Sequence, residues 1–495
     1  MPGKFRPRLK SRGRGAVRLF RVIWLLSAGA GLLAALDVKS FGAKGNATSD
    51  DTAALQRAIN ACPAQGTVTF PAGTYSVSGL VLKPRCTYSG VTGARLVLRS
   101  RNGFIFDISE RSDIHITGLV LDGGGLGGGI LARGDTPVRN IQVDKCEFRN
   151  VPDSAPYPAN LAIVSTYGIV DARLEANQFT DVAGGIWLTS VQNVGILDNS
   201  FQNVTQGNAI TVAPGPVRFP SGDNLRITGN TGKNLARMGI ETFRPDPPNG
   251  SMLRAPIVEN NSFSDWTAPH WMGISVTHGD GGTIRGNKVS NPSGPGQNTG
   301  IEVIIANAQV IGNTVSGNFA DGILVIGTAA PTITGNTVIG VSNVGIGLAC
   351  DSGRKRCASR DAKITGNTIK NAQLIGIKLD NDWSNGVVSG NTITRTAGSW
   401  KDDKQVRFSG IHQSPAPGKG TIEFNTIVQD AARSPAGFDF CGVRVNSPMP
   451  GSSIRNNVFR SSTPGPLGIG IADNTGKATS GWVIRDNSYV NVGKP

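Results

Sequence analysis

Residues 311–346 read IGNTVSGNFADGILVIGTAAPTITGNTVIGVSNVGI. This stretch contains one unit twice, at 312–315 and at 335–338: a small or polar residue, an asparagine, any residue and an apolar residue. The asparagine recurs along the chain, and the eleven intervals between Asn177 and Asn487 average about 28 residues, the length of one unit of a solenoid. The asparagines, with a weaker copy at 230, are Asn177, Asn199, Asn230, Asn261, Asn287, Asn313, Asn336, Asn367, Asn391, Asn425, Asn457 and Asn487.

A second marker, a glycine followed by isoleucine or valine, comes roughly ten residues after most of these units. Its glycines are at 185, 239, 273, 300, 322, 345, 376, 410 and 442. Apolar residues alternate around both markers, which is typical of strands and not of helices. Three short strands joined by turns fit into one repeat, and such coils stack at one strand spacing, about 4.8 Å. The sequence therefore predicts an all-β solenoid whose parallel strands each bury one face.

The recurring asparagine has a structural explanation. A short amide side chain tolerates the left-handed conformation of a tight turn, and it can hydrogen-bond to the equivalent amide one coil away. A catalytic residue has no reason to recur in a dozen coils. We therefore predict that the asparagines form a ladder and take no part in chemistry.

The stretch DVKSFGAKGNATSDDTAALQRAINAC at 37–62, together with the repeats after it, resembles a known family. It is similar to the right-handed parallel β-helix proteins of the pectate-lyase-like superfamily, above all to the rhamnogalacturonase/epimerase-like pectate-lyase domain with PbH1-type repeats. The resemblance implies a single-stranded right-handed parallel β-helix with an N-terminal capping helix. The residues agree with it, because Ser49, Asp50 and Asp51 can cap a helix and match its dipole. Such a helix would cover the open end of the solenoid.

The formal net charge of +15 is concentrated at the start of the chain. Eight basic residues lie in the first 21 positions, where there is no Asp or Glu, and the apolar stretch VIWLLSAGAGLLAAL follows at 22–36. This order is typical of a secretory signal. We expect 1–35 to be a signal peptide or, if uncleaved, an N-terminal anchor, and 37–495 to be one right-handed parallel β-helix domain. The protein would then be exported to the periplasm, the cell surface or the extracellular space.

Six cysteines in an exported chain permit disulfides. Cys350 and Cys357 enclose a short charged loop and could close it locally, whereas Cys146 and Cys441 lie too many repeats apart to meet. For the remaining cysteines, buried free thiols and disulfides stay equally open. The spacing lacks a CxxC motif, so structural zinc is disfavoured.

Functional residues should lie on the outside of the solenoid. If the isoleucine after each marker glycine points into the core, the next residue points outward, because side chains alternate along a strand. Read coil by coil, this outward position holds Trp187, Glu241, Ser275, Glu302, Leu324, Gly347, Lys378, His412 and Arg444. Asp380 occupies the next outward position of its coil. Polar residues gather in two zones, from Glu241 to Glu302 and from Lys378 to Arg444.

The second zone suggests chemistry on an anion. Lys378, His412 and Arg444 would stack at one strand spacing, where three potential cations repel one another unless an anion is present. In β-elimination on a uronate chain, cations neutralise the sugar carboxylate and a neutral side chain abstracts the adjacent proton. We therefore predict that Lys378, His412, Arg444 and Asp380 are catalytic. A solvated polar strand, partly paired by Asp380, is the competing interpretation.

We assign Glu241, Glu302, Trp187 and Trp383 to substrate binding. The two carboxylates would lie two coils apart, about 9.6 Å, which is near the upper end for the pair of an inverting glycosidase. An exposed indole can stack on a sugar face, although each tryptophan can equally pack locally. His115, in the alternating run DIHITGLVL, should be an exposed strand residue.

Several enzyme signatures of the superfamily are absent. The chain lacks the combined polygalacturonase set, an Asn-Thr-Asp run with Asp-Asp, Gly-His-Gly and Arg-Ile-Lys. It also lacks the Asp-Pro-His of alginate epimerases and the Arg-x-Pro-x-x-Arg of pectate lyases. The resemblance therefore implies a fold more than a reaction. We hypothesise an exported polysaccharide-active protein, a lyase or a related hydrolase or epimerase, that acts on acidic, uronate-containing glycan. A non-catalytic glycan-binding envelope or matrix protein is the alternative, and the apparent signal disfavours a phage tailspike.

The expected partner is an acidic polysaccharide and not a nucleic acid. A membrane enters only if the N-terminal segment is uncleaved, and we expect a monomer. The pattern requires no cofactor, and calcium is compatible with it. Inserts interrupt the repeat at 213–222, 243–257, 350–361 and 397–406, and they should rim the binding face.

Overall fold

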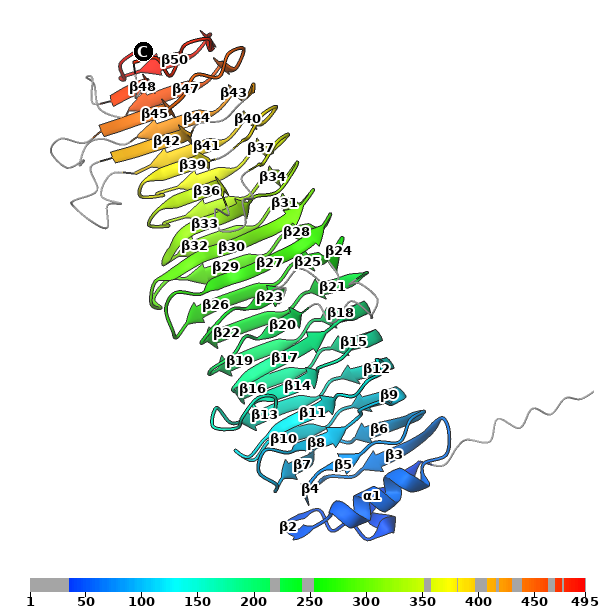
Figure 1. The fold of residues 1–495 in the computed structure, drawn as a ribbon. Helices are drawn as coiled ribbons and strands as arrows, with labels where there is room; N and C mark the ends of the chain where they lie inside the picture. Colours follow the sequence, from blue (N-terminus) through cyan, green and yellow to red (C-terminus); the bar gives the residue numbers. More distant parts are fainter. Residues whose placement is uncertain are drawn as a thin grey trace, which may run out of the picture.

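The structure is a computed structural model that describes residues 35–213, 223–242, 253–350, 358–380, 382–396, 407–414, 418–429, 439–461, 468–473 and 476–494. These residues form one long stack of coils, with the helix α1 (Thr52–Ala61) at the N-terminal end and the strands β48 (Gly468–Asp473) and β50 (Ser488–Val490) at the other (Figure 1). The predicted right-handed parallel β-helix with its capping helix is confirmed.

Three parallel sheets run along the stack. Each coil gives one strand to each of them in turn, as in β37 (Lys363–Thr365), β38 (Thr368–Lys370) and β39 (Ile375–Leu379). We call them sheet A, from β1 (Leu36–Asp37) to β49 (Val483–Arg485), sheet B, from β2 (Asn46–Asp50) to β50, and sheet C. The strands of sheet C are β5 (Leu80–Val81), β8 (Phe104–Asp107), β11 (Gly128–Ala132), β14 (Leu161–Ser165), β17 (Gly184–Thr189), β20 (Ile210–Ala213), β23 (Ile240–Thr242), β24 (Leu253–Arg254), β27 (Met272–Asp280), β30 (Gln297–Ala306), β33 (Phe319–Ile326), β36 (Val344–Ala349), β39, β42 (Arg407–Gln413), β45 (Asp439–Val445) and β48.

The core is a column of apolar side chains inside the coils. Because strand side chains alternate, one coil sends Ile364, Ile369 and Ile377 inward from its three strands, and each is fully buried. Equivalent residues meet face to face in neighbouring coils: the ring centroids of Phe148 and Phe179 lie 4.9 Å apart in parallel planes. Strand alternation therefore decides which side chains remain outside for function.

The asparagine ladder is confirmed along the turn between sheets A and B. Asn313 donates its Nδ2 to Oδ1 of Asn336 (2.9 Å) and to the carbonyl of Ile284 (2.9 Å), and the same Oδ1 accepts the Asn313 backbone N–H. Our assignment of the left-handed conformation was wrong by one position. It belongs to the residue before each asparagine, such as Gly312 (φ 62°) and Gly335 (φ 64°), so the asparagine is the buried hydrogen-bonding member of the turn.

The capping helix α1 follows the expected Asp-Asp pair. The two carboxylates do not both bond to the helix, as we had predicted, but have different partners. Asp50 accepts hydrogen bonds from the backbone N–H (3.0 Å) and hydroxyl (2.5 Å) of Thr52 at the start of the helix. Asp51 is buried and instead accepts the backbone N–H groups of Lys44 (2.6 Å) and Gly45 (3.1 Å). Asp50 therefore bonds to the first residue of the helix. Asp51, the N-cap residue, makes no side-chain capping bond and fixes the loop that precedes the helix.

Cys62 and Cys86 form a disulfide that joins the end of α1 to the first coils. The sequence had left this pair open. Cys146 and Cys441 are buried thiols that are not bonded to one another, as expected. Cys350 is disulfide-bonded, but Cys357, the partner we expected, lies outside the described residues.

Within the described ranges, no helix is long and apolar enough to cross a membrane. Residues 1–34, which hold nearly all of the predicted signal or anchor, lie outside those ranges.

Candidate functional site

The outward row of sheet C lies where the sequence placed it. Backbone pairing carries the row without a break from Trp187 in β17 to Arg444 in β45. The structure adds Thr211 between Trp187 and Glu241, because that coil has Asn208-Ala209 where the others have a glycine marker. In order, the row is Trp187, Thr211, Glu241, Ser275, Glu302, Leu324, Gly347, Lys378, His412 and Arg444.

Lys378, His412, Arg444 and Asp380 come together at the C-terminal end of the row, and we call them the basic cluster. Lys378 pairs directly with His412 in the neighbouring strand, and His412 with Arg444 in the next. All four are half-buried. Lys378 Nζ lies 2.9 Å from Asp380 Oδ2, and Arg444 Nε donates to Ser409 Oγ (3.0 Å). With a neutral histidine, the four side chains carry one net positive charge, which suits one carboxylate.

His412 is held in its neutral form. Burial lowers its pKa, and the positive charges of Arg444 and Lys378 lower it further, although Asp380 opposes this. The Asn446 amide nitrogen lies 2.6 Å from His412 Nε2 and, in this orientation, donates to the lone pair of a neutral ring. A neutral imidazole can accept a proton at the ring nitrogen that carries the lone pair.

Asp380 is held as a carboxylate. Burial alone would raise its pKa, but hydrogen bonds from Lys378 and Ser414 outweigh burial and bring the pKa below its ordinary value. Asp380 therefore stays charged and can orient the Lys378 ammonium.

Sequence reasoning missed Asp321, whose carboxyl acts electrostatically on Lys378. It accepts the side-chain amide of Asn343 (2.9 Å) and the backbone N–H of Val344 (3.1 Å), yet burial raises its pKa. The signal was available, since Asp321 stands directly before the marker glycine at 322.

Glu241 and Glu302 form the second polar zone of the row. Ser275 lies between them, as expected, and donates to Glu302 Oε2 (2.7 Å). Asn208 donates to Glu241 Oε2 (2.5 Å), but burial dominates and raises the pKa of Glu241. The two carboxylates thus lie two strand spacings apart along the row, and their surroundings differ. Leu324 and Gly347 separate them from the basic cluster.

The two predicted tryptophans differ. Trp187 is half-buried on the outer face of sheet C, where its ring meets that of Tyr157 edge-on at 5.6 Å. Trp383 was assigned to substrate binding, but its side chain is fully buried against Gly386 and Gly420. It cannot stack on a sugar, so this assignment is wrong: the loop folds its indole inward.

The predicted inserts lie largely outside the described residues. Their attachment points are nevertheless visible, because each gap adjoins a strand of sheet C. The chain leaves β20 at Ala213, β23 at Thr242 and β36 at Ala349, and it enters β42 at Arg407. All four inserts thus join the solenoid at the edges of the face that carries the row.

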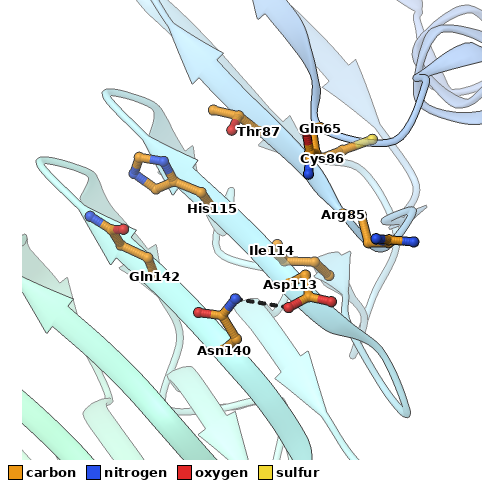
Figure 2. A pocket seen from close by; sticks show the side chains of 9 residues that line it. All are labelled: Gln65, Arg85, Cys86, Thr87, Asp113, Ile114, His115, Asn140 and Gln142. Carbon is orange, nitrogen blue, oxygen red and sulfur yellow. Dashed lines mark hydrogen bonds between the residues drawn. The ribbon is translucent and has the colours of Figure 1, made fainter. Parts of the chain in front are cut away.

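A polar hollow of about 410 Å³ lies elsewhere, on sheet A. Figure 2 shows Thr87, His115 and Gln142 there on three adjacent strands, β6 (Cys86–Gly90), β9 (Ser112–Thr117) and β12 (Val138–Asp144). His115 does lie on the outer face, and it contacts the buried Asp144 (2.6 Å). Gln142 also donates to Asp144 (2.8 Å), and Asn140 donates to Asp113 (2.8 Å), so four side chains of this hollow already have hydrogen-bond partners.

In the part of the chain that the structure describes, no three His, Cys, Asp or Glu side chains are grouped to hold a metal ion. The compatibility with calcium remains a prediction.

Two family models match the chain. One, described as a right handed beta helix region, matches residues 249–427, and one described as rhamnogalacturonase A/epimerase, pectate lyase-like, matches residues 35–104. A mutant tailspike protein of E. coli bacteriophage HK620 in complex with a pentasaccharide superimposes with a TM-score of 0.56 at 13% identity, over 91% of this chain and 80% of the tailspike chain. At that identity the likeness concerns the fold.

Curated relatives match shorter stretches. Mannuronan C5-epimerase AlgE1 of Azotobacter vinelandii is 27% identical over 251 residues, 41% of this chain and 18% of the epimerase. Exo-poly-alpha-D-galacturonosidase of Dickeya chrysanthemi is 37% identical over 62 residues, 12% of this chain and 10% of the enzyme. Iota-carrageenase of Alteromonas macleodii is 55% identical over 49 residues, which are 9% of this chain and 10% of the enzyme. The chain therefore spans less than a fifth of the length of each of these relatives.

Proposed function

Because the chain belongs to the right-handed β-helix superfamily, we propose that its basic cluster acts on an acidic, uronate-containing polysaccharide, as a lyase that cleaves by β-elimination. The observation that carries the proposal is the register of Lys378, His412 and Arg444 on three consecutive strands, with Asp380 paired to the lysine. A neutral base between two cations is the arrangement that removal of a proton next to a carboxylate requires.

The proposed chemistry divides among the side chains. Arg444 binds the sugar carboxylate and neutralises it, which acidifies the adjacent C5–H bond. His412 takes that proton at Nε2, so the Asn446 amide must first turn away from the ring. The electron pair forms the C4–C5 double bond as the C4–O bond breaks. The departing glycosidic oxygen then takes a proton from the Lys378 ammonium, which Asp380 positions.

The relatives support the choice of an acidic substrate. Mannuronan and polygalacturonate, named in two of them, are uronate chains, and carrageenan is acidic through the sulfate groups of a galactan. Export also fits a protein that meets such polymers. We propose that residues 1–35 direct it and that the protein acts as a monomer.

One assay tests the reaction. The purified protein is incubated with alginate, polygalacturonate and a neutral glucan, with and without calcium, and both the ultraviolet absorbance of unsaturated ends and the number of reducing ends are followed. A lyase raises both signals on a uronate chain only, and His412→Gln should lower the rate by about 10²- to 10⁴-fold.

Other outcomes replace the proposal. New reducing ends without unsaturation would assign the reaction to hydrolysis, for which Glu241 and Glu302 are the candidate pair. Altered uronate composition without new ends would indicate epimerisation. Tight binding with neither change would make the protein a glycan-binding component of the envelope or matrix.

A further inference from the structure

The outer face of sheet C carries a small apolar cluster outside the main core. Outward strand positions are normally polar, yet Leu131 in β11 and Val164 in β14 point outward and are 6% and 0% exposed. Leu161 packs with them, and Phe104 and Trp187 cover them in part. The cluster is a small second core on the outer face of sheet C, and Phe104 and Trp187 pack against its buried side chains.

An exposed aromatic ring lies beside this cluster. Tyr157 is 57% exposed, and its ring leans edge-on against Trp187 with 5.6 Å between centroids. A tyrosine held by a second aromatic residue presents a rigid apolar surface to solvent at small entropic cost.

A hollow of about 380 Å³ opens beside Tyr157 and Phe104. Its rim adds three polar side chains, Asn102, Asp107 and Arg133. A purely apolar partner would take water away from the charged groups of Asp107 and Arg133. A sugar ring fits better, because it presents a C–H face to an aromatic ring and hydroxyl groups to amide, carboxylate and guanidinium.

The hollow belongs to the same row as the candidate site. Asp107, Leu131 and Val164 pair in sequence and lead directly to Trp187. From Val164 to Lys378 the row spans eight strand pairings, roughly 38 Å. A long glycan along the face of sheet C would reach both ends.

We infer that Tyr157, Phe104 and the polar side chains of the hollow form a distal sugar-binding subsite. It holds one pyranose unit of a glycan chain, and another unit of the same glycan places its uronate at the basic cluster. The identity of that glycan rests on the proposed function. The subsite makes affinity depend on chain length, since short oligomers cannot occupy it together with the basic cluster.

The test compares four variants by calorimetric titration with polygalacturonate and with its trisaccharide. Tyr157→Ala should weaken polymer binding about tenfold and leave trisaccharide binding unchanged, because it removes only the distal stacking surface. Tyr157→Phe keeps the ring and should bind like the parent protein. Phe424→Ala is the matched control, since Phe424 is also exposed (58%) but lies on the turn between sheets A and B. Arg444→Ala should weaken both ligands.

The outcomes separate the two proposals. Polymer binding by Tyr157→Ala equal to that of the parent, or an equal loss for trisaccharide and polymer, overturns the distal subsite even if Arg444→Ala is impaired. Impairment of Tyr157→Ala for the polymer alone, with Arg444→Ala unaffected, supports the subsite and overturns the charge-based function. No binding of either ligand by the parent protein overturns both.

Discussion

The asparagine ladder and the outward row of sheet C are both columns of side chains that meet once per coil. In the ladder the residue stays the same from Asn177 to Asn487, and each amide is bonded to the next. In the row the residue changes at nearly every coil, and carboxylates, a leucine, a glycine and cations follow one another. A column that stabilises the stack needs identity, because each member is the partner of the next. A column that recognises a ligand needs different side chains, because each must contact a different group of the sugar.

Breaking the ladder should have the largest effect. Asn313→Leu removes the acceptor of the Asn287 backbone N–H and side chain, and the donor to Asn336 and Ile284. Because buried groups are left without partners, the free energy of unfolding should fall by roughly 3–5 kcal/mol, measured by urea denaturation.

Asn298→Leu is the control for the ladder, since Asn298 is exposed and bonds to the carbonyl of His270 (2.9 Å). It should lose at most about 1 kcal/mol. Equal losses in the two variants would mean that the ladder adds nothing beyond an ordinary hydrogen bond. If the solenoid unfolds in steps, the loss of stability will be confined to the coils near the substitution. Amide hydrogen exchange should therefore be measured as well, because it reports on each coil separately.

Changing the row should weaken binding without unfolding the protein. Lys378→Ala and Arg444→Ala should each weaken binding of polygalacturonate by about 1–3 kcal/mol, because each removes a charge-assisted contact. Their unfolding free energies should change little, since both side chains lie on the outer face.

Two matched variants remove the same charges from sheet A. Lys363 and Arg226 are exposed outward residues of that sheet. Lys363→Ala and Arg226→Ala should bind the glycan as the parent does in moderate salt. A uniform loss in all four variants would show that net charge, and not the row, attracts the polymer.

The smallest effect concerns pH. The unfolded chain protonates His412 near pH 6.5, whereas burial and the cations keep the folded ring neutral to lower pH. Between those two pKa values the unfolded state binds more protons, so stability falls as pH drops below about 6.5. His412→Gln should flatten this part of the stability profile relative to the parent, measured by thermal denaturation from pH 7.5 down to about 5. Parallel profiles would place the titration elsewhere.

The sequence alone predicted the features that repeat from coil to coil. The period of the asparagines and the alternation around Gly322 or Gly345 are enough to derive the coil, its strands and the outward row. It failed where a residue has no counterpart in other coils. The burial of Trp383 depends on one loop fold. Burial raises the pKa of Asp321, while Asn343 and Lys378 in other coils oppose that shift. Tyr157 and Trp187 meet through a loop of irregular length. Contacts of this kind depend on three-dimensional packing, and a period cannot encode them.

We propose above all that the varied row of sheet C, and not the other two faces, binds an acidic glycan. A crystal structure of the protein with a uronate oligosaccharide tests it most directly. We predict sugar density along the outer face of sheet C, with a carboxylate within hydrogen-bonding distance of Arg444 and Lys378 and the adjacent C–H directed at His412. Density confined to the hollow around His115 on sheet A, or to sheet B, would contradict the claim.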